Sequence, residues 1–441
     1  MVLNVPRRQP CLLLAQAAAL PRLCSQLTLA SGLRELVLDL RGRAADAVTT
    51  RIAALSRLTQ VDSLQLRGIA IDAEASRLVT TLSPLSRLTQ LALRFDWDHW
   101  DTAEQHTTFP WERAVCVLSS LQDLHVSTDI DEPQSRVRMF KGALPAAMSR
   151  LTALRHLAVL GMDEWDARDD SDQLLLPALP ALETAALRLH TLCGQVPSLC
   201  DQRQVTVSHL VSLSIALRVE VDLEEPYADT HIPAIIAPAL TELMLDDIKL
   251  APDSQQLSWL PGLPKLRRLV LKDVKTAAKE LPGGALQCSR LTELVLSRFQ
   301  ISYSHQPADE ENGYRPECKL RSLPDAGPYL NQRACLSLVK NGFTVVPHCL
   351  AAATALTTLD LGDQNLRHFC CAQHAEPVRG LHVLDNLTQL RCVRLIGFRK
   401  CGAGLRRFRA VRPDVELVLQ KKPLRMRMRV SKTSDCMFDR L

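Results

Sequence analysis

Leu263-Pro-Lys-Leu266-Arg-Arg-Leu269-Val-Leu271 is one copy of a pattern, Leu-x-x-Leu-x-x-Leu-x-Leu, that recurs through most of this 441-residue chain. Its closing Leu-x-Leu alternates as a short β-strand does, with both leucines facing the core and the residue between them facing outward. The preceding Leu-x-x-Leu has the spacing of a helix or turn and returns the chain to the same core. One copy cannot bury its apolar side alone, so the copies are predicted to stack.

Each copy can be marked by the first residue of its closing triplet. The fourteen markers are Leu36, Leu64, Leu91, Leu124, Leu157, Ala185, Leu213, Leu243, Leu269, Leu294, Leu336, Leu359, Val393 and Leu417. The 381 residues from the first marker to the last contain thirteen steps, an average of about 29 residues. This length lies at the upper end of the ~20–29 residues of known leucine-rich repeats.

On these residues the chain resembles the leucine-rich repeat family, in particular its long-repeat members of the ribonuclease-inhibitor type and the repeat regions of F-box proteins. The resemblance implies an α/β solenoid of about 14 repeats, curved, with a parallel sheet on the concave face and helices on the convex face. Five residues past each marker the family usually places Asn or Cys. Asn341 follows that pattern, whereas six other repeats have an apolar residue there: Ile69, Met162, Ile248, Val274, Phe299 and Phe398. An Asn there satisfies backbone groups and an apolar side chain does not, so irregular turns are predicted.

Departures from the repeat divide the chain into five predicted segments. Residues 1–26 form a helical lead-in that caps the core, and residues 27–300 form a first block of repeats. Residues 301–334, rich in proline and charge, form an irregular loop before a second block at 335–420. Residues 421–441 form a basic, disordered tail whose seven basic and two acidic residues account for the whole net charge of +5. The repeats are therefore neutral overall, which argues against a general nucleic-acid binder.

The cysteine pattern predicts a cytoplasmic protein; the family resemblance implies the cytoskeleton or ciliary axoneme as an alternative location. The 14 cysteines are scattered, without paired spacing or clustered caps, as expected of reduced thiols. No apolar run reaches the ~18 residues of a membrane span. Arg7-Arg8 and the apolar stretch 11–20 resemble a secretion signal, but they run directly into the first repeat and are predicted to be its leading helix.

No catalytic signature is present in the sequence. It has no phosphate-binding loop, no Gly-x-Ser-x-Gly, no His-Glu-x-x-His and no kinase motif. We therefore predict no enzyme activity, no cofactor and no small-molecule substrate. One group of soft ligands resembles a metal site: His348, Cys349, His368, Cys370, Cys371 and His374. Zinc sites usually use two spaced pairs, whereas the adjacent Cys370 and Cys371 point apart, so buried core cysteines are favoured.

Two segments that interrupt the repeats are the first candidate binding surface. They carry Trp97, Trp100 and Trp165 together with Asp96, Asp98 and Asp166. Exposed tryptophan is a typical interface anchor, and the surrounding carboxylates would steer a basic partner. The alternative, equally weighted, is that the indoles cover the edge of the solenoid as plugs while the acids stay in solvent.

The outward strand positions are the second candidate surface. We single out Arg67, Arg94, Glu242, Asp246, Arg268 and Lys272. Mixed charge suits a protein partner better than a polyanion, and the alternative is a solvated face without a ligand.

These features predict a non-enzymatic, monomeric scaffold that binds another protein across its concave face and Trp-bearing edge. The resemblance to F-box repeat regions implies a second possibility, the substrate-receptor subunit of a ubiquitin ligase. That role needs an F-box ahead of the repeats, where the sequence predicts only the helical lead-in. A cytoskeletal or ciliary scaffold is implied by the family resemblance alone. The basic tail could bind acidic lipid, nucleic acid or an import receptor, but a solubilising role is favoured.

Overall fold

The fold is taken from a computed structural model of the chain. The residues that it describes are 12–16, 33–39, 54–69, 82–95, 115, 117–128, 150–162, 179–191, 204–219, 234–250, 257–276, 281, 283–300, 320–325, 327–343, 345–362, 379–395 and 402–419.

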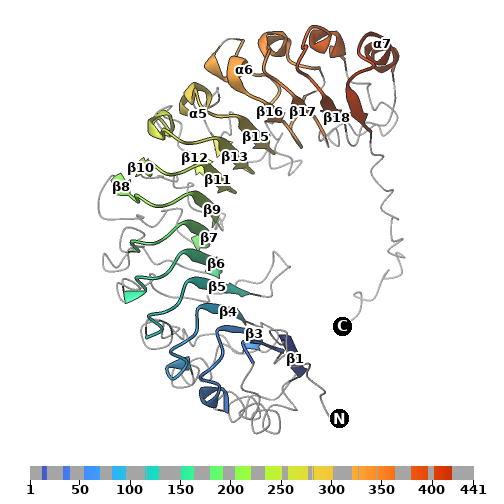
Figure 1. The fold of residues 1–441 in the computed structure, drawn as a ribbon. Helices are drawn as coiled ribbons and strands as arrows, with labels where there is room; N and C mark the ends of the chain where they lie inside the picture. Colours follow the sequence, from blue (N-terminus) through green and yellow to red (C-terminus); the bar gives the residue numbers. More distant parts are fainter. Residues whose placement is uncertain are drawn as a thin grey trace, which may run out of the picture.

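Fifteen strands within these ranges form one parallel sheet whose spatial order is the sequence order. They are β1 (Leu12–Gln16), β2 (Glu35–Asp39), β3 (Ser63–Ile69), β4 (Gln90–Phe95), β5 (Asp123–Thr128), β6 (His156–Met162), β7 (Thr184–Thr191), β9 (Ser212–Val219), β11 (Glu242–Asp246), β13 (Arg268–Lys272), β15 (Glu293–Ser297), β16 (Cys335–Ser337), β17 (Thr358–Asp360), β18 (Cys392–Arg394) and β19 (Glu416–Val418). Two small parallel sheets pair β8 (Gln204–Thr206) with β10 (Ala234–Ile236), and β12 (Lys249–Leu250) with β14 (Lys275–Thr276). Figure 1 shows the large sheet lining the inside of an arc.

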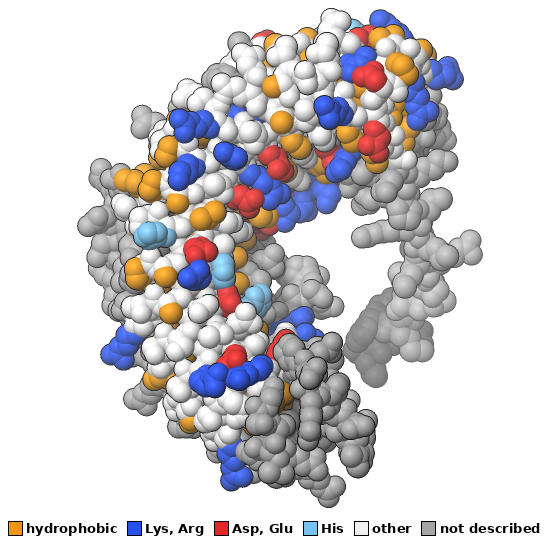
Figure 2. Space-filling model, in the orientation of Figure 1, with side chains coloured by type: hydrophobic (Ala, Val, Ile, Leu, Met, Phe, Trp, Pro, Cys, Tyr) orange, Lys and Arg blue, Asp and Glu red, His pale blue; other side chains and the backbone are white. Residues whose placement is uncertain are grey.

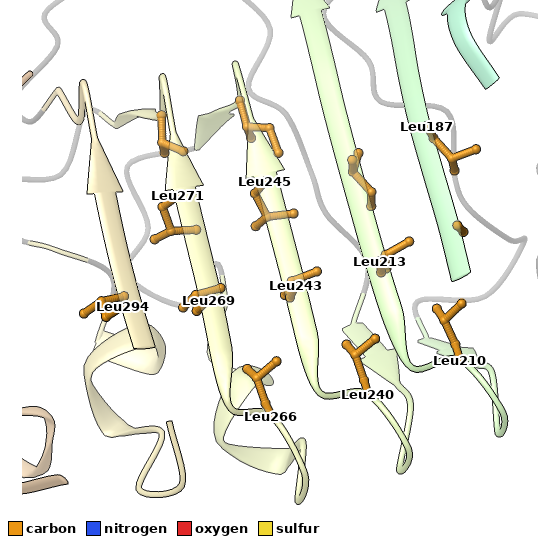
Figure 3. Close-up of a cluster of buried hydrophobic side chains, with 14 of the residues drawn as sticks. Leu187, Leu210, Leu213, Leu240, Leu243, Leu245, Leu266, Leu269, Leu271 and Leu294 are labelled. Carbon is orange, nitrogen blue, oxygen red and sulfur yellow. The ribbon is translucent and has the colours of Figure 1, made fainter. Parts of the chain in front are cut away.

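The predicted phase of the repeat is confirmed at every marker. Leu36 lies opposite Leu64, and each marker then lies opposite the next, through to Val393 opposite Leu417. All markers except the partly buried Leu417 are at most 3% exposed. The leucines therefore stack in columns along the core, as Figure 3 shows for Leu213 and its neighbours. The chain is a curved leucine-rich repeat solenoid with fourteen repeats in the predicted phase.

Strand β1 is an addition to the predicted repeats. Leu13 lies opposite Leu36, so residues 12–16 extend the sheet by one strand. The predicted helical lead-in is wrong for these five residues. The apolar run Leu12–Ala15 has no period that distinguishes a helix from a strand, whereas the open edge of β2 offers unpaired backbone groups to a strand.

The outer layer is built from short elements among the described residues. The 3-10 turns are η2 (Ala54–Arg57), η5 (Leu260–Gly262), η6 (His348–Ala352) and η8 (Leu381–Leu384), and the α-helices are α5 (Gly283–Gln287), α6 (Pro328–Gln332) and α7 (Ala403–Val411). The Leu-x-x-Leu arms are mostly tight turns, as where the Leu58 amide donates to the Leu55 carbonyl at 2.9 Å. Helix α6 lies inside the predicted loop 301–334, and its Leu330 is buried. None of the helices in these ranges has the length and apolar character needed to cross a bilayer.

The turn after the strand can be compared between Asn341 and its described apolar equivalents, and its backbone is more regular than predicted. Asn341 is fully buried, donates from Nδ2 to the Leu296 carbonyl at 2.7 Å and accepts from the Phe299 amide at 2.8 Å. At the same position Ile248 and Val274 are buried without such side-chain bonds. The residue before this position has positive φ in several repeats: Gly68, Asp247, Asp273, Arg298 and Lys340.

Two buried arginines join the repeats of α6 and α7 to their predecessors, a feature that the leucine pattern does not predict. Arg333 ends α6, and its guanidinium donates to the carbonyls of Leu291 and, at 2.7 Å, Cys288. Arg412 ends α7 and donates to the equivalent two carbonyls, at 2.7 and 3.1 Å, in the preceding repeat. Burial lowers the pKa of Arg333 to about 10. Each planar guanidinium donates hydrogen bonds to two backbone carbonyls, and an apolar side chain in its place would leave those carbonyls without these bonds.

Candidate functional site

The concave face consists of the strand residues one before, one after and three after each marker. Because neighbouring strands lie about 4.8 Å apart in register, residues at the same position form rows that run along the solenoid. Figure 2 shows acidic and basic side chains interspersed along the inner edge of the arc. A row therefore brings together residues about one repeat apart in sequence.

The central part of this face carries an ionic row across β11, β13 and β15. Arg268 lies between two acids in register, Glu242 and Glu293. Its Nε is 3.0 Å from Glu293 Oε1, and its Nη1 is 4.0 Å from Glu242 Oε2. The Arg268 side chain remains 45% exposed, so the row is accessible while its charges are largely balanced.

A second ionic row runs along the ends of the same strands. Lys272 Nζ lies 2.5 Å from Asp246 Oδ2, and Asp246 keeps only 9% of its side chain exposed. Beyond them Arg298 pairs with Asp273. Burial raises the pKa of Asp273, and the charge of Arg298 opposes that rise.

Apolar side chains separate the two ionic rows. They belong to Met244, Val270 and Val295, which lie opposite one another in register. Val270 was expected to be an accessible outward residue, but it is only 8% exposed. Side chains converge on the inner side of a curved sheet, so an outward direction there does not ensure contact with solvent.

The N-terminal part of the face has a different charge pattern. Arg67 lies opposite Arg94, so two like charges are adjacent on β3 and β4. Burial lowers the pKa of His125, and the charge of Arg94 lowers it further. His156 on β6 links its neighbours, with Nε2 3.6 Å from Asp123 Oδ1 and Nδ1 2.9 Å from Thr184 Oγ1.

The structure thus places the predicted charged residues in two groups. Arg67 and Arg94 lie on β3 and β4; Glu242, Asp246, Arg268 and Lys272 lie on β11 and β13. Four strands, β5, β6, β7 and β9, separate the groups. The outward residues of this intervening region are mostly small, among them Ala158, Ala186, Ser214 and Ala216. The sequence analysis did not predict that Arg268 pairs with its neighbours. The signal was present, because three successive repeats have Glu, Arg and Glu at the position directly before the marker.

The predicted edge residues Trp97, Trp100, Trp165, Asp96, Asp98 and Asp166 lie outside the described residues. The strands that lead to them are described: β4 ends at Phe95 and β6 ends at Met162. Because the sheet is parallel, both segments begin at the same edge and are separated at their origin by one strand, β5.

The group of soft ligands can be placed only in part. His348 and Cys349 lie in η6, and the other four residues fall outside the described ranges. Cys349 is buried, in keeping with a core cysteine. His348 lies beside His382, with ring centroids 6.2 Å apart. Within the part of the chain that the structure covers, no group of three or more His, Cys, Asp or Glu residues is arranged to hold a metal ion.

Comparison with known proteins finds a likeness in structure at low sequence identity. No protein-family model matches the sequence, and no curated protein matches it. Among solved structures, a leucine-rich repeat protein from Bacteroides thetaiotaomicron is similar at 13% sequence identity and a TM-score of 0.37. The likeness covers 88% of this chain and 51% of that chain, so this chain spans about half the length of the Bacteroides protein. The fold assignment rests on the strand register of the chain itself.

Proposed function

We propose that this chain is a non-enzymatic scaffold that binds another protein across its concave face. The observation that carries the proposal is the fixed row Glu242–Arg268–Glu293, in which a continuous sheet holds charged side chains in register across three repeats. Such a surface presents a preset pattern of charge to a partner, which is how solenoids commonly bind.

Preorganisation supports binding at this row. Ordering a long side chain at an interface costs about 0.5–1.5 kcal/mol. Arg268 and Lys272 are already held by carboxylates on neighbouring strands, so part of that ordering precedes the encounter. The alternation of sign also favours a protein over a polyanion, because a polyanion would lie against Glu242 and Glu293 as well as Arg268.

We further propose that the protein acts in the cytoplasm. Four cysteines among the described residues are free thiols: Cys288, Cys335, Cys349 and Cys392. Free thiols are typical of reducing compartments. No observation on the described residues favours the ubiquitin-ligase or ciliary alternatives.

The test exchanges charges without removing the internal ion pair. In the variant Arg268→Glu/Glu293→Arg the two side chains can still pair, but the order of charges that a partner meets along the row changes from minus, plus, minus to minus, minus, plus. The control is Arg57→Glu/Arg150→Glu, which changes two exposed arginines outside the concave rows. Proximity labelling with mass spectrometry should show partners that are lost with the exchange and kept with the control. If both variants label the same proteins as the native chain, the concave row is not the binding surface.

The Trp-bearing segments stay a separate proposal for the edge of the same interface. The variant Trp97→Ala/Trp100→Ala/Trp165→Ala should fold normally and lose a basic partner, with binding that weakens in salt because the carboxylates steer it. The plug alternative predicts a lowered unfolding midpoint with the partner retained. A destabilised triple variant that still captures the same proteins would exclude these tryptophans from the interface.

A further inference from the structure

The flat side of the solenoid, where the strands begin, carries its own row of charged residues. We call it the lateral row; it comprises the residues two and four positions before each marker. In the N-terminal repeats its arginines are neutralised by an acid one repeat away. Arg34 Nη1 and Arg87 Nε lie 3.4 and 3.6 Å from the two carboxylate oxygens of Asp62, and Arg155 Nη1 lies 3.3 Å from Glu183 Oε1.

The lateral row loses this compensation at β13 and β15. Lys265, Arg267 and Arg290 are exposed, and none of them has an ion-pair partner in the described part of the chain. Arg290 donates only to the Pro264 carbonyl, at 2.8 Å. Figure 2 shows basic side chains gathered on this side of the arc, over the repeats of β13 and β15. Three like charges thus lie together on two successive repeats.

Neutral residues occupy the places where acids stand in the earlier repeats. Arg267 lies between Thr241 and Thr292 in the lateral row. Its backbone N–H donates a hydrogen bond to the Thr241 carbonyl, and the backbone N–H of Thr292 donates one to the Arg267 carbonyl. Both threonine hydroxyls donate to backbone carbonyls of the preceding repeat, at 3.2 Å each. The two threonine side chains therefore bond to the backbone and offer no carboxylate to the three cations, which have no ion-pair partner among the described residues.

An exposed apolar residue continues the same row. Val211 is 39% exposed, and the Thr241 amide donates to its carbonyl at 2.8 Å. Val211 therefore lies two strands from Arg267, or about 10 Å at the usual strand spacing. An apolar contact beside uncompensated cations fits a ligand that combines carboxylates with one apolar side chain.

We propose that Lys265, Arg267 and Arg290, together with Val211, form a second docking surface for an acidic segment of a partner protein. A nucleic acid needs a longer line of phosphate contacts than two repeats provide. Patches for anionic lipid usually contain about 4–8 basic residues, more than this surface has. A short peptide that carries several carboxylates and one apolar side chain matches both the extent and the composition of the surface.

The experiment uses the full chain and a fluorescein-labelled peptide with one Leu and four Glu residues. A second peptide, with Gln in place of every Glu, is the ligand control. Fluorescence anisotropy compares the native chain with the patch variant Lys265→Gln/Arg267→Gln/Arg290→Gln. The matched variant Arg57→Gln/Arg150→Gln/Arg406→Gln removes the same number of exposed positive charges elsewhere. Circular dichroism checks that both triple variants are folded.

The native chain should bind the Glu peptide and not the Gln peptide. The patch variant should weaken that binding by about tenfold, as three exposed charge interactions together provide, while the matched variant keeps it within about twofold. Val211→Ser should weaken binding of the peptide that contains Leu and leave an all-Glu peptide unaffected. Binding should also fall as salt is added.

Three results would overturn the proposal. The first is an equal loss of Glu-peptide binding in the patch variant and the matched variant. The second is binding of the Gln peptide as tight as that of the Glu peptide. The third is that the native chain binds phosphatidylserine vesicles but no peptide, and that the patch variant loses the vesicle binding. The exchange Arg268→Glu/Glu293→Arg should leave peptide binding unchanged. The two proposals can therefore fail separately: the peptide assay tests the lateral row alone, and the exchange variant tests the concave face alone.

Discussion

Replacing Asn341 tests whether one buried amide stabilises the junction between the repeats of β15 and β16. Asn341 on the β16 repeat bonds two backbone groups of the β15 repeat, the Leu296 carbonyl and the Phe299 amide. Between these repeats the chain makes its longest excursion, 42 residues from marker to marker. The variant Asn341→Leu keeps the branching of the side chain at the γ carbon, with a larger volume, and removes both hydrogen bonds.

The expected cost follows from what is left unbonded. A buried backbone group that loses its partner costs about 1–3 kcal/mol. Two such groups give about 2–6 kcal/mol for Asn341→Leu. Asn341→Ala adds the loss of packing and should cost more. Val274→Ala is the matched control, because Val274 occupies the equivalent position and contributes packing without side-chain hydrogen bonds.

Hydrogen exchange gives the local readout and urea unfolding the global one. Asn341→Leu should lower the protection of the Phe299 amide and the midpoint of unfolding, whereas Val274→Ala should lower the midpoint and leave the Phe299 amide protected. If Asn341→Leu matches the native chain in both measurements, the two backbone groups find other partners and the amide is not a structural link.

Three further changes probe the core, the buried arginines and the strand ends. Leu243→Ala should cost on the order of 2–5 kcal/mol in urea unfolding, and Met244→Ala much less, because only Leu243 lies within a column of the core; equal losses would contradict the assigned phase. Arg333→Lys should lower stability by about 1.5–3 kcal/mol, because an ammonium does not span two carbonyls as a guanidinium does; an unchanged midpoint would refute this. Burial raises the pKa of Asp273, so the folded state holds its proton more tightly than the unfolded state, and stability falls as pH rises from the ordinary aspartate range through the raised value. Asp273→Asn keeps an acceptor for Arg298 and tolerates the positive φ, so its unfolding midpoint should rise relative to that of the native chain as pH rises; a difference between the two midpoints that stays constant, or moves against the variant, over this pH range would contradict that sign.

The core was predictable because the leucine column depends on local spacing alone. The Leu-x-Leu triplet sets which side chains face inward, and the next repeat supplies the same residues at the same place. Even Ala185 and Leu213, the less regular markers, lie opposite their neighbours as expected. Strand β1 was not predictable in this way, because its apolar residues have no alternation and its conformation depends on the open edge of β2.

The buried arginines show a second limit of the leucine pattern. Arg333 and Arg412 read as exposed charges in the sequence, yet they are 1% and 8% exposed. Each follows a helix that replaces the usual Leu-x-x-Leu turn, and each reaches two carbonyls of the preceding repeat. The contacts of these two arginines depend on the geometry of the helix that replaces the turn, and the leucine pattern does not specify that geometry.

The candidate surfaces depend on which charges neutralise one another. The concave residues Arg268 and Lys272 were predicted as partner contacts from their outward phase, and the phase is correct. In register, however, both already have carboxylate partners, so a protein that binds there meets a surface with little net charge. Arg267, next to Arg268 in the chain, faces the flat side, where its neighbours are threonines. Among the described surfaces, we therefore expect an acidic partner at the lateral row, and at the concave face a partner that matches the order of its charges.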